Sequence, residues 1–181
     1  MTNKKLNVKH SKLKNIMKQK TQKQNIGNAG EYYIASRLSA LNFLVTITLG
    51  RAEKYDILTL SPNGKLFKIS VKTKQLENAY NFTLSEKDEK GQSKDFYYAF
   101  IRLNEFKKEP DFWIIPSKVV CLLMKESHRK WKNTPGRNNR AHGTSSVRCL
   151  PIELRGSDKL YYPKNWEAEM KKYYKNFDQL V

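Results

Sequence analysis

The chain has 181 residues, of which 39% are hydrophobic, so it is long enough to enclose the core of one domain. Its formal net charge of +18 far exceeds what solubility needs, and self-repulsion of this size is usually tolerated because the partner is a polyanion. No run reaches the roughly 18 apolar residues of a membrane span, and two cysteines are too few for a disulfide framework, so the sequence favours a nucleic-acid partner, no membrane, and a reducing cytoplasmic location.

The positive charge is concentrated in two segments. Residues 1–24 carry eight lysines and no acid, and residues 125–148 carry seven lysines or arginines against one glutamate. Together they account for fourteen of the eighteen net charges, and we expect both to contact phosphates. For residues 1–10 the alternative is a solvated tail. We therefore divide the chain into a basic N-terminal arm, 1–24, and a single domain, 25–181, with a basic loop at 125–148.

The first strongly patterned element is a helix. After a break at residues 25–27, Asn28 begins a segment in which Ile34 and Leu38 recur at helical spacing and define an apolar face. Glu31 belongs to that same inward face. Asn28 and Glu31 also have the spacing of a capping box, in which Glu31 would only satisfy a backbone donor. Both roles for Glu31 remain open at this point.

A strand and a β-hairpin follow this helix. Residues 43–49 are rich in β-branched and large apolar side chains, and residues 55–73 contain two strand-like runs around a turn. The turn is residues 61–64, Ser-Pro-Asn-Gly, in which proline suits the first central position and glycine accepts a positive φ. We expect a type I turn followed by a left-handed glycine in a bulge, which pairs Ser61 with Lys65.

This register gathers three polar side chains on one face of the hairpin. Counting back from the turn two residues at a time, Asp56 lies opposite Ser70, and Lys72 follows on the same face. Alternate residues of the second strand, such as Phe67 and Ile69, point the other way and are apolar enough to be core. The sequence thus predicts a carboxylate, a hydroxyl and an ammonium beside one another.

The remainder predicts further strands and two helices. Residues 96–103 are apolar on both sides, which is typical of a central strand, and residues 112–115 form another short strand. Ser117 is placed to cap a helix, and residues 147–154 predict a late strand. A final helix begins near Asn165, and its aromatic stripe is expected to lie in the core or in a homodimer seam.

Residues 127–148 have no usable periodicity and are expected to form a loop. A loop of that length in a compact domain is usually functional or disordered. Its arginines would meet phosphates or guanine edges, and a lysine on the face of Lys72 would add a phosphate contact or simply be an exposed strand end. The expected nucleic-acid contacts are Lys18, Lys20, Lys74, Arg137, Arg140 and Arg148.

In chain order, the helical Glu31 precedes the strand acid Asp56, a hairpin turn, and Ser70-Val71-Lys72 on the next strand. This order resembles the pattern of the PD-(D/E)XK nuclease superfamily, in which a strand acid, a turn and acid-x-Lys often follow a helical Glu. The match covers residues 28–75. The resemblance implies an α/β fold of the restriction-endonuclease-like kind, a mixed central β-sheet flanked by α-helices.

The resemblance also implies a mechanism. Asp56 and Glu31, together with the Val71 carbonyl, would hold Mg²⁺ or Mn²⁺. The ion would stabilise charge on the scissile phosphate and help to deprotonate a water, and Lys72 would orient that water or bind the phosphate. The implied activity is metal-dependent hydrolysis of phosphodiester bonds in DNA, with RNA left open and a homodimer matching the two strands of a duplex.

Ser70 departs from the family pattern. Where the family has Glu, Asp or sometimes Gln, this chain has a neutral hydroxyl, which is a poor metal ligand. The loss of one anionic ligand makes the site depend on Glu31. Two hypotheses follow: a metal-dependent endonuclease in which Ser70 stays among the catalytic residues, or a catalytically inactive nuclease-fold protein that only binds nucleic acid.

Overall fold

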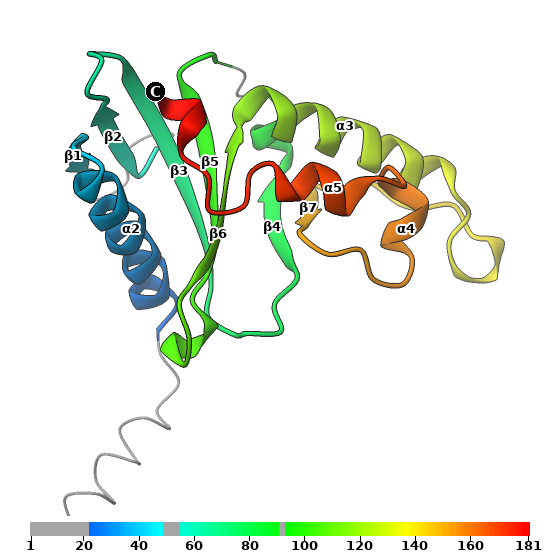
Figure 1. Cartoon of the computed structure of the whole chain (residues 1–181). Coiled ribbons are helices and arrows are strands. Elements are labelled where there is room, and N and C mark those ends of the chain that lie inside the picture. Colours follow the sequence, from blue (N-terminus) through cyan, green and yellow to red (C-terminus); the bar gives the residue numbers. More distant parts are fainter. Residues whose placement is uncertain (1–21, 49–54, 91–92) are drawn as a thin grey trace, which may run out of the picture.

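The computed structural model describes residues 22–48, 55–90 and 93–181 (Figure 1). The helices and strands are, in chain order, α2 (Lys23–Ala40), β1 (Leu44–Ile47), β2 (Ile57–Leu60), β3 (Leu66–Lys74), β4 (Asn81–Ser85), η1 (Glu86–Glu89), β5 (Phe96–Arg102), η2 (Asn104–Phe106), β6 (Asp111–Pro116), α3 (Ser117–Asn133), η3 (Arg137–Asn139), β7 (Val147–Pro151), α4 (Asp158–Tyr161), α5 (Trp166–Lys171) and η4 (Asp178–Leu180). No helix in these ranges is both long and apolar enough to cross a membrane.

The central feature is a five-stranded mixed sheet in the order β1-β2-β3-β5-β6. Its neighbouring strands are antiparallel except for β3 and β5, which are parallel. The remaining strands, β4 and β7, form a separate two-stranded antiparallel sheet. The predicted fold class, a mixed central sheet flanked by helices, is confirmed.

Two apolar cores cover the two faces of the central sheet. Helix α2 lies on one face, and α3, α5 and the β4–β7 sheet lie on the other (Figure 1). β5 contributes side chains to both cores, and all of its residues except Arg102 are buried, as expected of a central strand. The side chains that alternate along β3 therefore face either α2 or the side of the small sheet.

Helix α2 begins earlier than the sequence indicated. It starts at Lys23, so Gly27 and Asn28 lie inside the helix, and the capping box proposed for Asn28 and Glu31 is wrong. The Asn28 Oδ1 instead accepts a hydrogen bond of 2.8 Å from the Gln24 side chain. The helix continues through a glycine because tertiary contacts outweigh its low propensity: Ile26 already packs against the core.

Helix α3 also extends further than predicted. It continues to Asn133, so the first part of the expected loop at 127–148 is helical. Val120, Met124 and Ser127 are all buried at helical spacing, and the polar residues between them lie on the outer face. The sequence did not indicate this extension, because the buried face of the helix continues through the polar residue Ser127.

The predicted C-terminal helix is interrupted. α5 ends at Lys171, and Lys175 takes a left-handed φ of 50°. The chain then runs along the edge strand β6, where the Lys175 N–H donates to the Phe112 carbonyl at 2.9 Å. The residues of the predicted stripe therefore belong to the cores on both faces of the central sheet. Trp166 packs in the core on the α3 side, and Phe177 packs in the core on the α2 side.

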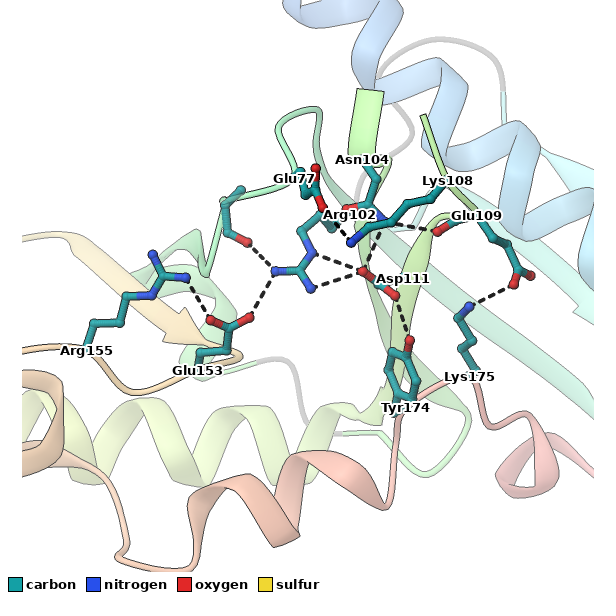
Figure 2. Close-up of polar contacts among 11 residues, drawn as sticks. Glu77, Arg102, Asn104, Lys108, Glu109, Asp111, Glu153, Arg155, Tyr174 and Lys175 are labelled. Atoms are coloured by element: carbon teal, nitrogen blue, oxygen red, sulfur yellow. Dashed lines mark hydrogen bonds and ion pairs between the residues drawn. The ribbon is translucent and has the colours of Figure 1, made fainter. Parts of the chain in front are cut away.

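A polar network closes the ends of β5 and β6. Arg102 pairs with Asp111 at 3.0 Å and with Glu153 at 3.1 Å, and Figure 2 shows its guanidinium between the two carboxylates. The Asp111 carboxylate also accepts hydrogen bonds from Asn104 at 3.0 Å and from the Tyr174 hydroxyl at 2.6 Å. The network joins the central sheet to the segment that follows β7 and to the C-terminal segment.

Gly30 lets α2 pack closely against the sheet. A Cβ at this position would lie 2.1 Å from Thr73 Oγ1 and 2.9 Å from Ile101 Cγ2. We expect Gly30→Ala to lower the free energy of unfolding by about 1–3 kcal/mol, because the helix must move away from β3. Urea denaturation of the purified variant measures this loss.

Gly27 offers a matched control on the same helix. A Cβ there meets no atom within 4 Å, so Gly27→Ala should stabilise the protein by about 0.5–1 kcal/mol through helix propensity. Denaturation midpoints that move in the same direction for the two variants would contradict the packing argument.

Candidate active site

The hairpin that carries the predicted polar residues has the expected turn. The Ser61 N–H donates to the Lys65 carbonyl at 2.8 Å, and Gly64 has a φ of +79°. Ile57, the first residue of β2, pairs with Ile69 of the antiparallel β3. Asp56, which directly precedes β2, therefore lies opposite Ser70. The predicted register is confirmed.

Asp56 is anchored through one carboxylate oxygen. Its Oδ2 accepts hydrogen bonds from the Val71 N–H at 2.6 Å and from the Ser70 hydroxyl at 3.2 Å. Its backbone is also fixed, because its N–H donates to Ile69 at 2.9 Å and its carbonyl accepts from Thr48 at 2.9 Å. Oδ1 has no hydrogen-bond partner in the part of the chain that the structure describes. One oxygen is therefore available to a ligand.

The strand β3 extends beyond its partner at this point. β2 begins only at Ile57, which pairs with Ile69, whereas β3 continues to Lys74, and no described strand pairs with that edge of β3 beyond Ile69. The Lys68 N–H and the Lys74 carbonyl both bond on the β5 side. Because backbone groups alternate along a strand, the Val71 carbonyl points to the uncovered edge, where Asp56 lies.

Glu31 reaches the same edge from α2. Gly30 packs on Thr73, which brings this turn of the helix over the uncovered part of β3. Glu31 is half-buried, and burial, followed by the charge of Asp56, raises the pKa of its carboxyl above the ordinary value. It makes no hydrogen bond or ion pair with a described residue. Two carboxylates with free oxygens thus lie close enough to repel each other.

Lys72 lies on the same face of β3 as Ser70, as the alternation predicts, and is half-buried. Its ammonium makes no hydrogen bond or ion pair within the described ranges. Ser70 is only 5% exposed, and its hydroxyl donates its hydrogen bond to Asp56. The structure thus brings Asp56 and Ser70 into contact. Glu31 lies near enough to Asp56 for the charge of Asp56 to act on it, and Lys72 follows Ser70 on the same face of β3.

The donor atoms at this edge are all oxygens. No group of three or more His, Cys, Asp or Glu side chains gathers anywhere among the described residues, in keeping with serine at position 70. Asp56 Oδ1, Glu31 and the Val71 carbonyl nevertheless suit Mg²⁺, which is usually held by one or two carboxylates, substrate phosphates and waters. Burial and the charge of Asp56, which together raise the pKa of Glu31, both disfavour its ionised form, and a bound cation favours that form.

Of the predicted nucleic-acid contacts, Arg140 is exposed and Lys74 is partly exposed. Arg148 is not free for such a contact, because it is 7% exposed and paired with Glu89. The alternation of β7 turns it inward beside Leu150, and a buried cation requires a partner. Lys18, Lys20 and the side chain of Arg137 lie outside the described part of the chain.

Two supporting residues were not predicted from the sequence. Thr48 holds the backbone of Asp56, since its N–H and hydroxyl both bond to the chain there. Gly30 allows α2 to approach β3 and so carries Glu31 to the site. A glycine directly before a helical acid was a visible signal for Gly30, whereas no sequence pattern marks Thr48.

No protein-family model matches the chain, and a search of curated proteins finds no match. Among solved structures, the chain is similar to a bacterial homing endonuclease, I-Ssp6803I, with a TM-score of 0.44 and 15% sequence identity. The superposition covers 85% of this chain and 95% of that one.

Proposed function

We propose that this protein is a metal-dependent DNA endonuclease with a site of the PD-(D/E)XK type. The observation that carries the proposal is the Asp56 carboxylate, which is fixed through Oδ2, whereas Oδ1 has no partner among the described residues and the charge of Asp56 acts on the half-buried Glu31. Two repelling carboxylates without partners are costly for a fold, and they are expected where a cation is bound.

Each residue at the edge of β3 has a role in this proposal. Asp56, Glu31 and the Val71 carbonyl would hold Mg²⁺ or Mn²⁺. When bound, the ion supplies positive charge to the scissile phosphate and polarises the attacking water. Lys72 binds the phosphate or orients the water. Ser70 holds the Asp56 carboxylate in place by donating a hydrogen bond to it, which is a positioning role rather than that of a ligand.

The DNA backbone would be held electrostatically. The cations assigned to this contact are Lys74, Arg137 and Arg140 of the domain, with Lys18 and Lys20 of the basic N-terminal arm. Binding that relies on such contacts weakens steeply as salt rises, because bound counterions are released from the DNA. A homodimer would bring one site to each strand of a duplex.

The test is cleavage of DNA by the purified full chain. Supercoiled plasmid and branched DNA are incubated with Mg²⁺, with Mn²⁺ and with a chelator, beside Asp56→Ala and Lys72→Ala. Nicking that requires the metal and is lost in both variants supports the proposal. Cleavage that persists unchanged in both variants would place the activity elsewhere or in a contaminant.

The second candidate is a nucleic-acid-binding protein without catalytic activity. Serine at position 70 favours it, because a neutral hydroxyl stands where a third carboxylate would help to hold a cation, and the described residues contain no cluster of three such ligands. Tight, salt-dependent DNA binding with no metal-dependent cleavage of either substrate would establish this candidate.

The raised pKa of Glu31 gives a prediction that does not require cleavage. A carboxyl must lose its proton to bind a cation, so Mn²⁺ affinity should rise through a pH range that starts above the ordinary value of 4.5. Glu31→Gln should weaken Mn²⁺ binding by about tenfold or more, since even outer-shell residues contribute that much. Calorimetric titration of Mn²⁺ between acid and neutral pH measures both effects.

The same variant has a second expected outcome. Because the folded-state pKa of Glu31 is raised, its ionised form costs stability at pH values above that pKa. Glu31→Gln should therefore leave the melting temperature at pH 7 unchanged or higher. A clear loss of stability would indicate that Glu31 is structural.

A further inference from the structure

A pocket of about 310 Å³ lies between the end of α3, β7 and α4, apart from the Asp56 site. None of the proposed catalytic residues lines it. Its walls combine aromatic rings with a carboxylate and a thiol, and the side chains that matter for its chemistry are His128, Trp131, Tyr161, Tyr162, Asp158 and Cys149.

Ring contacts hold the walls of the pocket. The Trp131 ring stacks on His128 with centroids 5.2 Å apart and on His142 with centroids 4.1 Å apart. His142 thereby ties the segment that follows α3 back to the helix. The Tyr162 hydroxyl donates a hydrogen bond to the Cys149 carbonyl, which joins α4 to β7. The pocket is therefore formed before any ligand arrives.

The interior of the pocket carries little positive charge. Burial, with the nearby Arg148, lowers the pKa of His128, and burial, with the nearby Asp158, raises the pKa of the Cys149 thiol. Both groups are consequently neutral at pH 7. Arg148 also lines the pocket, but its guanidinium forms an ion pair with Glu89. Such an interior suits a neutral planar group better than a phosphate.

Lysines lie near two residues that line the pocket. Arg129, Lys132 and Lys159 are exposed and adjoin lining residues in sequence. Lys132 is near enough to oppose protonation of His128, and Lys74 is near enough to act on the Cys149 thiol. A strand whose phosphates contact β3 at Lys74 would thus pass beside the pocket, where Lys132 is a further cation.

Asp158 defines the edge that the pocket can recognise. Its Oδ2 accepts the Arg155 N–H at 3.3 Å, and its Oδ1 has no hydrogen-bond partner among the described residues. A carboxylate accepts hydrogen bonds only, so its natural counterpart on a base is an exocyclic amino group. Cytosine, adenine and guanine carry that group, whereas the one donor on the thymine edge is a ring N–H between two carbonyl oxygens, which a carboxylate repels.

We propose that this pocket receives one unstacked nucleobase with an exocyclic amino group, whose flanking phosphates lie on Lys74 and Lys132. The base stacks on the aromatic wall and donates to Asp158. The proposal rests on the nucleic-acid partner of the proposed function, but not on cleavage. The base comes from a bound strand or from a free nucleotide, and the experiment distinguishes these sources.

Cys149 provides the readout. It is exposed in the pocket, whereas the other cysteine, Cys121, is buried, so a maleimide should label the full chain at Cys149 alone. Labelling at pH 8 is followed by mass spectrometry with oligo-dC, oligo-dT, an abasic strand of equal length, or cytidine monophosphate present. Each strand is added at a concentration that saturates binding, and Cys149→Ser serves as the blank.

We expect oligo-dC to slow labelling by about tenfold and the abasic strand to slow it far less. A stacked base is worth about 1–3 kcal/mol, which corresponds to this range. Oligo-dT should protect less than oligo-dC, and Asp158→Asn should remove that difference. If cytidine monophosphate protects Cys149 as well as oligo-dC does, the pocket binds a base, and that base comes from a free nucleotide. Equal protection by the abasic strand and by oligo-dC would overturn the proposal.

Tyr161→Ala tests the aromatic wall, with Tyr32→Ala on exposed α2 as the matched control. Only the first should weaken protection by oligo-dC. The outcome is separable from that of the nuclease assay. DNA cleavage without base-specific protection would remove the pocket proposal alone, whereas base-specific protection without cleavage would remove the nuclease proposal alone.

Discussion

Asp56→Asn should lower metal-dependent DNA cleavage by on the order of 10³-fold while the protein stays folded. Asparagine retains an oxygen that can accept from the Val71 N–H and the Ser70 hydroxyl, so the anchoring bonds of 2.6 Å and 3.2 Å need not be lost. What disappears is the negative charge that a cation requires. DNA binding without metal should be equal or tighter, because a charge that repels phosphate has been removed.

Plasmid nicking in Mg²⁺ and Mn²⁺, thermal melting and DNA binding are measured on the same preparation. Asp178→Asn is a suitable control, since Asp178 is an exposed carboxylate near the C-terminus. It should cleave as the unmodified chain does. Undiminished cleavage by Asp56→Asn would show that Asp56 is only a structural carboxylate that ends the pairing of β2 and β3.

The geometry of the hairpin could be predicted because it depends on local chemistry. The turn residues fix the register near Gly64, and strict alternation then determines which residue lies opposite Asp56. The same alternation placed Lys72 on the face of Ser70. Only short-range rules are needed for these statements, and each is satisfied within the hairpin itself.

Other features depend on contacts between distant segments. The start of α2 is decided by packing of Ile26 on the sheet, which overrides a glycine that would otherwise break the helix. Arg148 is turned inward because β7 pairs with β4, a partner that no sequence pattern near Arg148 reveals. Likewise, the approach of Glu31 to Asp56 requires the contact between Gly30 and Thr73.

Asp111→Ala should cost the fold far more than any exposed carboxylate. Asp111 lies in the network of Figure 2, where its carboxylate bonds to Arg102, Asn104 and Tyr174. Its removal leaves the Arg102 side chain, which is 13% exposed, with Glu153 as its remaining anionic partner. Breaking a buried pair costs about 3–5 kcal/mol, and we expect roughly 3 kcal/mol because Glu153 stays in place.

Glu109 supplies the matched control for this prediction, because Glu109 also has several partners, including Arg37 and Lys175, but is 54% exposed. Glu109→Ala should change the urea midpoint little, since exposed ion pairs contribute little. Equal losses from the two substitutions would contradict the role given to burial.

The Asp111 network should also make the fold sensitive to acid. Burial would raise the pKa of Asp111, but hydrogen bonds from Tyr174, Asn104 and Arg102 outweigh it and lower the pKa below the ordinary value of 3.8. A lowered folded-state pKa means that the stabilisation is complete above the ordinary value and is lost as the pH falls through the folded one. The stability difference between the unmodified chain and Asp111→Asn should therefore be constant from neutral pH down to about pH 5 and shrink below pH 4. Urea titrations across this range measure it, and a difference that does not depend on pH would mean that shape, not charge, accounts for the contribution of Asp111.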